Sequence, residues 1–168
     1  MAKIEDHETD QEHQLAGKYL TFLVADEEYA LPILQVQEIV GLMPITPVPG
    51  TSNFIQGVIN LRGKIVPVAD MRSKFNIDLD AERPESCIIV TQADDIELGL
   101  IVDSVSDVTR IMSEDLDSVP DFGVDSTADY LIGIAQCNGQ VRLLIDVNRL
   151  FDSEDMEAYH SLGVDATF

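Results

Sequence analysis

The chain repeats part of its own sequence, and this repeat constrains the fold more than any other feature. Segment 57–75, GVINLRGKIVPVADMRSKF, aligns without a gap to segment 133–151, GIAQCNGQVRLLIDVNRLF. Two glycines, an aspartate and the final phenylalanine are identical, and apolar residues share many of the remaining positions. Two copies indicate a twofold duplication, since a solenoid needs at least three stacked units.

An earlier pair of segments matches in the same order. Segment 29–40, YALPILQVQEIV, aligns to segment 98–109, LGLIVDSVSDVT, at an offset shorter by about seven residues. The second copy therefore needs an insertion. We place the insertion in the polar stretch 113–129, which is predicted to be a long loop because it contains a proline and a glycine among many acids. We expect two similar units at about 18–80 and 86–151.

Each copy consists of short apolar segments typical of β-strands. The first, 18–25, is rich in aromatic and β-branched residues, and 31–40 alternates loosely between apolar and polar residues. The dipeptides Arg62-Gly63 and Asn138-Gly139 each separate two such segments and predict hairpin turns. The pattern predicts an all-β fold of small barrels or a sandwich, with helical structure limited to a turn at 51–57 and a terminal helix at 153–162.

The size of the units indicates how they pack. A unit of about 60 residues buries only a marginal core when it folds alone. We therefore expect the two units to share strands or pack tightly together, with a groove along their seam.

The composition excludes several classes of partner. The formal net charge of −21 opposes binding to nucleic acid or to an anionic membrane surface. No apolar run reaches the length of about 20 residues that a transmembrane helix needs. Residues 1–17 are predicted to form a flexible acidic tail without the features of a signal peptide, and 152–168 a terminal helix and tail. Cys87 and Cys137 lack metal-ligand or redox spacing and are interpreted as buried thiols. The lack of signal-peptide features makes the cytoplasm the expected location.

The sequence contains no recognisable catalytic or metal-binding motif. Of the three histidines, His7 and His13 lie in the acidic tail and His160 in the predicted terminal helix. Asp115 and Asp117 lie in an acidic stretch, but the glycine and final glutamate of a calcium-binding EF-hand loop are missing. We expect a protein that is not an enzyme and has no cofactor or metal.

Three motifs in order resemble the CheW-like family: VQEI at 36–39, FIQGVINLRGKIVPVADMR at 54–72 and GLIVDSVSDV at 99–108. The resemblance covers 18–151, and Met71 is the one departure from the family motif GxxNLRGxIxPxxDLR. It implies two SH3-like five-stranded β-barrels related by duplication around a shared apolar centre. It also implies an adaptor that couples chemoreceptors (methyl-accepting chemotaxis proteins) to the histidine kinase CheA.

The resemblance further implies that Glu38 and Arg62 matter for coupling. An arginine at a hairpin tip can reach a carboxylate on a neighbouring strand with two hydrogen bonds and so shape a partner-binding edge. The alternative is a surface ion pair worth about 0–1 kcal/mol. Asn138 replaces the arginine in the second copy, so the first barrel is expected to carry the specialised surface.

The other predicted site residues are apolar or glycine. The full set of partner-binding candidates is Ile33, Val36, Glu38, Ile39, Arg62, Val105 and Val108, of which the apolar members could instead belong to the core. Four glycines are predicted to serve backbone geometry at the strand edges: Gly57, Gly63, Gly99 and Gly133.

The expected partners are the regulatory domain of CheA, bound by the first barrel, and the helical tip of a chemoreceptor, bound in the groove between the barrels. We expect a monomer in isolation, which receptor arrays at the membrane recruit. Two alternatives stay open: a CheW-like scaffold of another kinase pathway, such as twitching motility or development, and a small acid-based hydrolase. The hydrolase would need a pocket that gathers two carboxylates or a histidine.

Overall fold

A computed structural model of the chain describes residues 15–49, 55–75, 77, 83–93, 96–117 and 130–150. These residues form strands almost throughout, which confirms the predicted all-β class. The strands are β1 (Gly17–Val24), β2 (Glu27–Pro32), β3 (Val36–Gly41), β4 (Ile55–Leu61), β5 (Lys64–Asp70), β6 (Cys87–Ala93), β7 (Ile96–Val102), β8 (Ser104–Ile111), β9 (Leu116–Asp117), β10 (Leu131–Cys137) and β11 (Gln140–Ile145).

Helical structure in the described residues is confined to single turns. The 3₁₀ turns are η1 (Ile33–Gln35) and η2 (Ser113–Asp115), and the α-helical turns are α2 (Met71–Lys74) and α3 (Val147–Leu150). None of these helices has the length and apolarity needed to cross a membrane.

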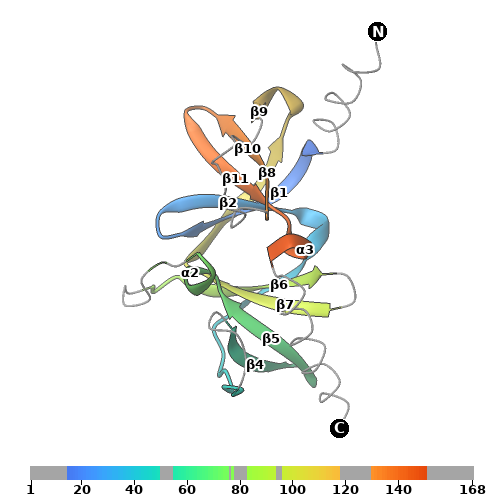
Figure 1. Ribbon diagram of the computed structural model, residues 1–168, viewed down its shortest axis with the longest axis vertical. Helices are drawn as coiled ribbons and strands as arrows, with labels where there is room; N and C mark the ends of the chain where they lie inside the picture. The colour runs from blue at the N-terminus through green and yellow to red at the C-terminus, as the bar shows by residue number, and fades with distance from the viewer. Residues whose placement is uncertain are drawn as a thin grey trace, which may run out of the picture.

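The strands form two sheets, one above the other, with α2 and α3 beside the boundary between them (Figure 1). Sheet A has the strand order β8-β1-β2-β11-β10-β9, and sheet B has the order β3-β6-β7-β5-β4. The predicted count of five strands is therefore correct for sheet B. Sheet A has a sixth strand because the two residues of β9 pair with β10.

The structure reproduces the duplication strand by strand. β1 to β5 correspond to β6, β7, β8, β10 and β11 at the two offsets found in the sequence. The hairpins β4–β5 and β10–β11 carry a register shift at the same place, before Gly57 and before Gly133. The parallel pairs match as well, because Leu144 opposite Ala30 corresponds to Val68 opposite Gly99.

The two sheets do not coincide with the predicted units 18–80 and 86–151. The first half contributes β1 and β2 to sheet A, and the second half contributes β6 and β7 to sheet B. Each sheet therefore combines strands of both copies by a reciprocal exchange. The cause is the pairing of β2 with β11 and of β7 with β5, both parallel, which joins strands far apart in the chain.

Several local predictions need correction. The predicted strand 31–40 is interrupted by η1, so that β2 ends and β3 begins within it. The start of the predicted loop 113–129 is instead η2 and β9. Strand β1 begins at Gly17, the last residue assigned to the acidic tail. Most of the predicted turn at 51–57 and the whole predicted helix 153–162 lie outside the described residues.

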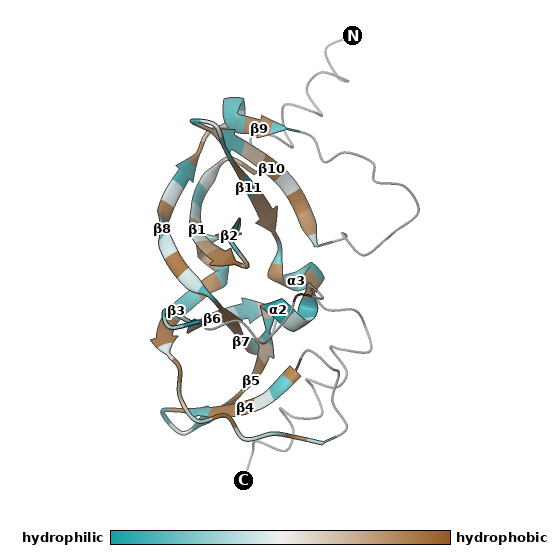
Figure 2. Cartoon of the chain, turned by 90° about the vertical axis from the view of Figure 1, so that its left-hand side faces the viewer, coloured by the Kyte–Doolittle hydropathy of each residue, from teal (hydrophilic) through white to brown (hydrophobic). Residues whose placement is uncertain are grey.

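The core has three parts, which follow from the two sheets. One apolar cluster fills the inner side of sheet B, with Ile59, Val66 and Ile88 among its members, and a smaller cluster including Ile111 and Leu144 fills sheet A. The largest cluster lies between the sheets and draws on β1, β2, β5, β6 and β7 together with α2 and α3. This agrees with the shared apolar centre that the family resemblance implied. The alternation of apolar and polar residues is visible along β4 and β8 in Figure 2.

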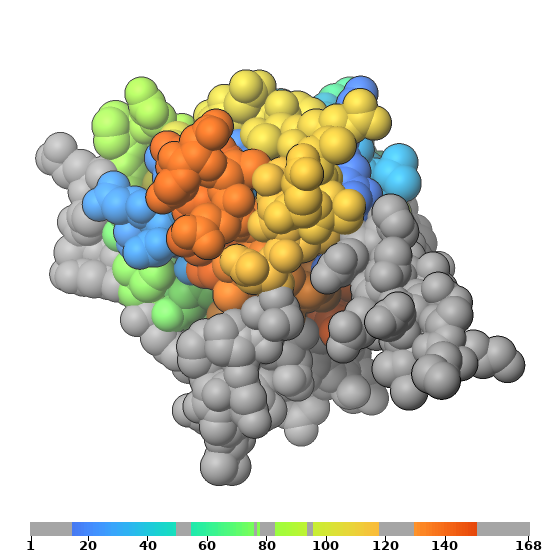
Figure 3. All heavy atoms as spheres, turned by 90° about the horizontal axis from the view of Figure 1, so that it is seen from above, coloured from blue at the N-terminus to red at the C-terminus, as the bar shows by residue number. Residues whose placement is uncertain are grey.

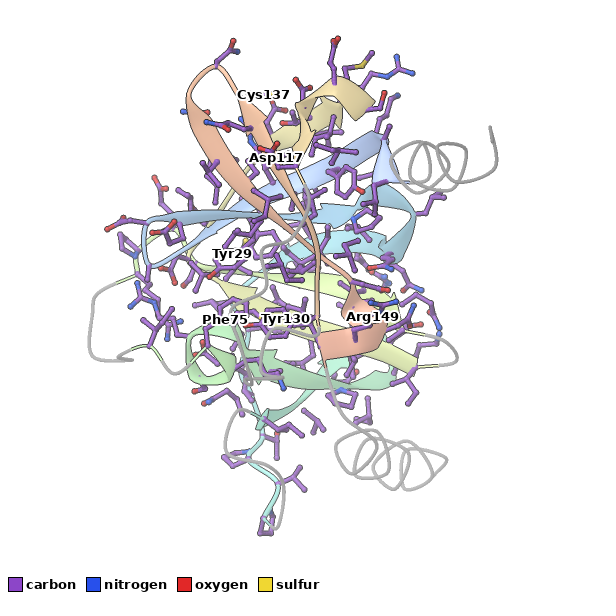
Figure 4. The ribbon with its side chains drawn as sticks, turned by 45° about the horizontal axis from the view of Figure 1, so that its top comes forward. Tyr29, Phe75, Asp117, Tyr130, Cys137 and Arg149 are labelled. Carbon is purple, nitrogen blue, oxygen red and sulfur yellow. The ribbon has the colours of Figure 1, made fainter. Side chains whose placement is uncertain are left out.

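A row of aromatic rings runs through the shared centre. Tyr29 stacks between Phe22 and Phe75, with ring centroids 5.9 and 4.7 Å away, and Phe75 contacts Tyr130 at 5.4 Å (Figure 4). Burial, with smaller contributions from nearby Tyr130 and Glu27, raises the pKa of Tyr29 to about 12. The row ties β1 and β2 to residues that follow α2 and precede β10, so it joins the two halves of the sequence.

Candidate functional site

An exposed ion pair joins the two edge strands of sheet B. Arg62, between β4 and β5, donates from Nη1 to Oε2 of Glu38 on β3 at 3.1 Å, and from Nη2 to Oε1. The prediction of a two-hydrogen-bond pair is thus met in geometry. The expectation of neighbouring strands is wrong, because β3 and β4 lie at opposite ends of the strand order. The pair therefore bridges the two ends of the sheet.

The turn that presents Arg62 has an unusual backbone. Arg62 and Gly63 have φ values of 52° and 86°, and the Asn60 side chain accepts a hydrogen bond from the Gly63 N–H at 2.9 Å. Two central residues with positive φ are typical of a type I′ hairpin turn, where asparagine and glycine are preferred. An arginine in the left-handed region is uncommon.

Electrostatics favours the charged forms of both partners. The hydrogen bond from Arg62 lowers the pKa of Glu38, and the same bond raises the pKa of Arg62. The side chain of Arg62 is 70% exposed and that of Glu38 is 30% exposed. An exposed pair contributes little to folding. Because the Arg62 side chain is largely exposed, most of its surface is available to another molecule.

Two further polar contacts surround this pair. Lys64 on β5 pairs with Glu97 on β7 at 2.8 Å, and Gln37 on β3 donates to Gln92 on β6 at 2.5 Å. Together with Glu38 and Arg62 they form a polar surface over β3 and the β4–β5 turn, which we call the β3 edge surface.

The second copy does not reproduce this surface. Asn138 takes the place of Arg62 with a nearly identical φ of 53°. The counterpart of Glu97 is Glu28, and its cation comes from a different position, Arg142 on β11, with Nε 3.1 Å from Oε2 of Glu28. Arg142 also donates to Gln140, and neither Nε of Arg142 nor Oε2 of Glu28 has a well-directed hydrogen bond in the described structure. The two hairpin tips therefore differ in charge and in packing.

The apolar candidates fall into two groups. Ile33, Val36 and Val105 are half-buried and pack against the cluster between the sheets. Ile39 on β3 and Val108 on β8 are exposed. The structure therefore places the candidates on both sheets and brings Glu38 and Arg62 into direct contact.

Several exposed apolar side chains were not predicted as site residues. They are Leu34, Leu42, Ile65, Met112 and Val141. The duplication carried a signal for some of them, because Ile65 and Val141 occupy equivalent positions, as do Ile39 and Val108. A residue that stays apolar and exposed in both copies is a candidate for contact with a partner.

The four predicted glycines differ in how closely they are surrounded. A Cβ on Gly57 would lie 2.1 Å from the carbonyl oxygen of Thr46. A Cβ on Gly99 would lie 2.9 Å from Ile88, and one on Gly133 would lie 3.3 Å from Leu15. Gly63 has open space around it but a positive φ. Close packing therefore requires glycine at 57 and 99, whereas the turn requires it at 63.

Arg72 belongs to a buried ionic cluster and not to the β3 edge surface. It donates from Nε to Oδ1 of Asp103 at 2.8 Å, and its Nη2 lies 2.5 Å from Oδ2. Arg83 binds both carboxylate oxygens of Asp70 at 3.1 and 3.0 Å and lies 3.8 Å from Asp103. Asp103 also accepts the Ala25 N–H at 2.8 Å. The cluster connects the β1–β2 turn, α2 and the β7–β8 corner.

This cluster bears on the hydrolase alternative, since Asp70 and Asp103 are two carboxylates close together. Both are paired with guanidinium groups, which leaves neither as a base with an open side toward a substrate. Within the described ranges, no three His, Cys, Asp or Glu side chains gather to hold a metal ion.

Comparisons with known proteins agree with one another. The model of the CheW-like domain matches residues 18–155. A chemotaxis protein CheW from Klebsiella aerogenes is 37% identical over 85% of this chain and 89% of its own length, and one from Rhizobium meliloti is 32% identical over 85% and 97%. The crystal structure of the scaffolding protein TtCheW from Thermoanaerobacter tengcongensis superposes with a TM-score of 0.75, is 35% identical and covers 84% of this chain and 96% of its own.

Proposed function

The chain belongs to the CheW-like family, and from that premise we propose that it is a non-catalytic adaptor that couples chemoreceptors to the histidine kinase CheA. The observation that carries the proposal is the β3 edge surface. An arginine in a costly backbone conformation is held across two edge strands by Glu38, where it adds little to stability. Strained residues of this kind gather at binding sites.

The β3 edge surface is proposed to bind the regulatory domain of CheA. The side chains of Glu38 and Arg62 give it both signs of charge, and the exposed Ile39 on β3 and Ile65 on β5 follow Glu38 and Lys64 in the chain. A polar rim around a few apolar anchors is the usual composition of a modest protein interface. The ion pair would fix the shape of the edge, so that partner binding does not have to order it.

The seam between the sheets is proposed to receive the receptor tip. Ile33, Val36 and Val105 pack against the shared centre and remain partly exposed, which suits a groove for an amphipathic helix. Two modest interfaces on one chain would hold kinase and receptor together in an array at the membrane, because binding at one surface raises the effective concentration at the other.

The test replaces Arg62 with asparagine, the residue of the second copy at the same φ. Arg62→Asn keeps the turn, removes the ion pair and suits the positive φ better, so the free energy of unfolding should stay the same or rise by up to about 1 kcal/mol. The affinity for the CheA regulatory domain, measured by calorimetry, should fall about tenfold or more, because an interfacial charge pair is lost. Glu38→Lys should act in the same way.

The matched control is Arg110→Asn, the same change at an exposed arginine on β8 of sheet A, outside the β3 edge surface. It should leave both the fold and the affinity nearly unchanged. Equal affinities of Arg62→Asn and the unmodified chain for both the kinase domain and the receptor tip would show that the β3 edge surface is not the interface.

A further inference from the structure

A cavity of about 460 Å³ opens beside the start of β1. The strand residues Gly17–Tyr19 and the preceding Leu15 and Ala16 form one wall, and Pro32 with η1 forms another. Ile132 and Asp146 complete the lining. The wall is mainly apolar, with Asp146, Gln35 and Lys18 as its polar members, and Leu34 stands 94% exposed at its edge.

The duplication relates this cavity to a position that is filled in the other sheet. Asp146 corresponds to Asp70, and each accepts the backbone N–H of the residue two positions later. Leu34 corresponds to Asp103 in the alignment of 29–40 with 98–109. At the Asp70 position the guanidinium of Arg83 is bound by both carboxylate oxygens. The cavity is thus the counterpart of an arginine-binding site.

The chain provides no arginine for the second position. By the offset that relates β1 to β6, the counterpart of Arg83 is Gln14, which is uncharged. Oδ1 of Asp146 accepts hydrogen bonds from Gln35 Nε2 at 2.7 Å and from the Asn148 N–H at 3.0 Å. Among the described residues, the cation nearest to Oδ2 is Arg149, whose Nε is 3.9 Å away, too far for a hydrogen bond, and whose side chain is 62% exposed (Figure 4).

We propose that the Asp146 cavity binds an arginine side chain of another protein, with an adjacent aliphatic residue of that protein packed on Leu34. The guanidinium takes the place that Arg83 occupies at Asp70 and donates to Oδ2 of Asp146. Asp103 supplies a second anion near Arg83 in the filled site. Its equivalent in the cavity is Leu34, which offers an apolar contact instead. The net charge of −21 favours the approach of a basic segment.

This site is separate from the β3 edge surface, since its lining comes from sheet A, η1 and the residue before α3, and of the residues assigned to the receptor groove it shares Ile33 alone. The inference therefore goes beyond the proposed function and would stand if the adaptor role were wrong.

The experiment uses the full chain and two small probes. The first is acetyl-isoleucyl-arginine amide, and the second is the same compound with citrulline, a neutral isostere of arginine. Amide chemical shifts are followed by NMR during titration with each probe. The arginine probe should shift the resonances of Leu34, Gln35 and Asp146 saturably, and the citrulline probe should bind about tenfold more weakly, because it cannot form the charge-assisted pair.

Two variants locate the binding. Asp146→Asn should weaken the arginine probe about tenfold. Leu34→Asp should strengthen the binding of acetyl-arginine amide, which lacks the isoleucine, because it restores the second anion of the Arg83 site. Leu34 is almost fully exposed, so this change should not disturb folding. The matched control is Asp107→Asn, an exposed aspartate on β8, which should leave the affinity unchanged.

Three results would overturn the proposal. They are equal binding of the two probes, the absence of any effect of Asp146→Asn and Leu34→Asp, and binding that appears only after removal of residues 1–14. The last result would assign the cavity to the chain's own N-terminal segment.

Discussion

Arg62 illustrates how a single residue can be placed against its own conformational preference. Its φ of 52° matches the 53° of Asn138 at the equivalent turn, although asparagine tolerates the left-handed region far better than arginine does. Such a conformation costs about 1–2 kcal/mol, and the exposed pair with Glu38 does not offset that cost for stability alone. Folding alone would favour asparagine at this position, so the arginine supports the proposal that the β3 edge surface binds a partner.

Gly57 gives a prediction at the same scale. The carbonyl oxygen of Thr46 would lie 2.1 Å from a Cβ at this position, and Thr46 forms two backbone hydrogen bonds with Val58, at 2.8 and 2.9 Å. Gly57→Ala should push residue 46 away and break this bridge. We expect a loss of about 2–4 kcal/mol in the free energy of unfolding, measured by urea denaturation.

Gly63→Ala is the matched control, because the added methyl group meets no atom within 4 Å. Only the positive φ opposes the change, so the loss should be about 1–2 kcal/mol. If Gly57→Ala were as mild as Gly63→Ala, the close approach of residue 46 to β4 would not exist in solution.

At the scale of elements, much was predictable from residue patterns. The hairpin turns at Arg62-Gly63 and Asn138-Gly139 were predictable because each turn has two residues, the second a glycine, between two apolar segments. The interruption of the strand by η1 was not predictable. Pro32 is compatible both with the end of a strand and with the start of a 3₁₀ turn, and the apolar residues beside it suggest a continuous strand. The strand β9 was not found because two residues carry no periodicity.

The ionic cluster was also invisible in the sequence, since Arg72, Arg83 and Asp103 come from separate segments. It makes stability depend on pH. Burial would raise the pKa of Asp103, but hydrogen bonds from Arg72 and the Ala25 N–H, with the charges of Arg72 and Arg83, hold it below its ordinary value. The ionised form therefore favours folding above about pH 4, the unfolded value, and this contribution is lost as the pH falls through the lower folded pKa.

The corresponding variant is Asp103→Asn. It should lower the free energy of unfolding by about 2 kcal/mol at pH 7, because Arg72 loses the carboxylate that it binds and Arg83, which keeps Asp70, loses a second nearby anion. The difference from the unmodified chain should shrink as the pH falls below about 4. Urea denaturation from pH 7 to pH 2.5 measures both effects. Glu97→Gln, which breaks an exposed pair, is the control, and a difference that grew at low pH would contradict this account of Asp103.

At the scale of the whole molecule, the sequence predicted two copies but not how they exchange strands. A repeat shows which segments are equivalent, and two equivalent copies can pair within themselves or with each other by the same contacts. Figure 3 shows the result in sheet A, where blue residues from the start of the chain lie against the orange residues of β10 and β11, in line with the pairing of β2 with β11. The exchange also explains which sites could be predicted. Glu38 and Arg62 were recognised from a sequence motif. The Asp146 cavity could not be predicted, because it forms only when β1 and β11, from different copies, join the same sheet.

The exchange predicts that neither half of the chain folds alone. Residues 1–82 lack β6 and β7, which stand between β3 and β5 in sheet B, and residues 83–168 lack β1 and β2, which stand between β8 and β11 in sheet A. Each half would therefore leave a gap of two strands in the sheet that holds most of its other strands. Circular dichroism and NMR should show little fixed structure in either fragment alone and recovery of the native spectrum when they are mixed. A fragment that unfolded cooperatively by itself would mean that strands pair within one copy, and the reciprocal exchange would then be wrong.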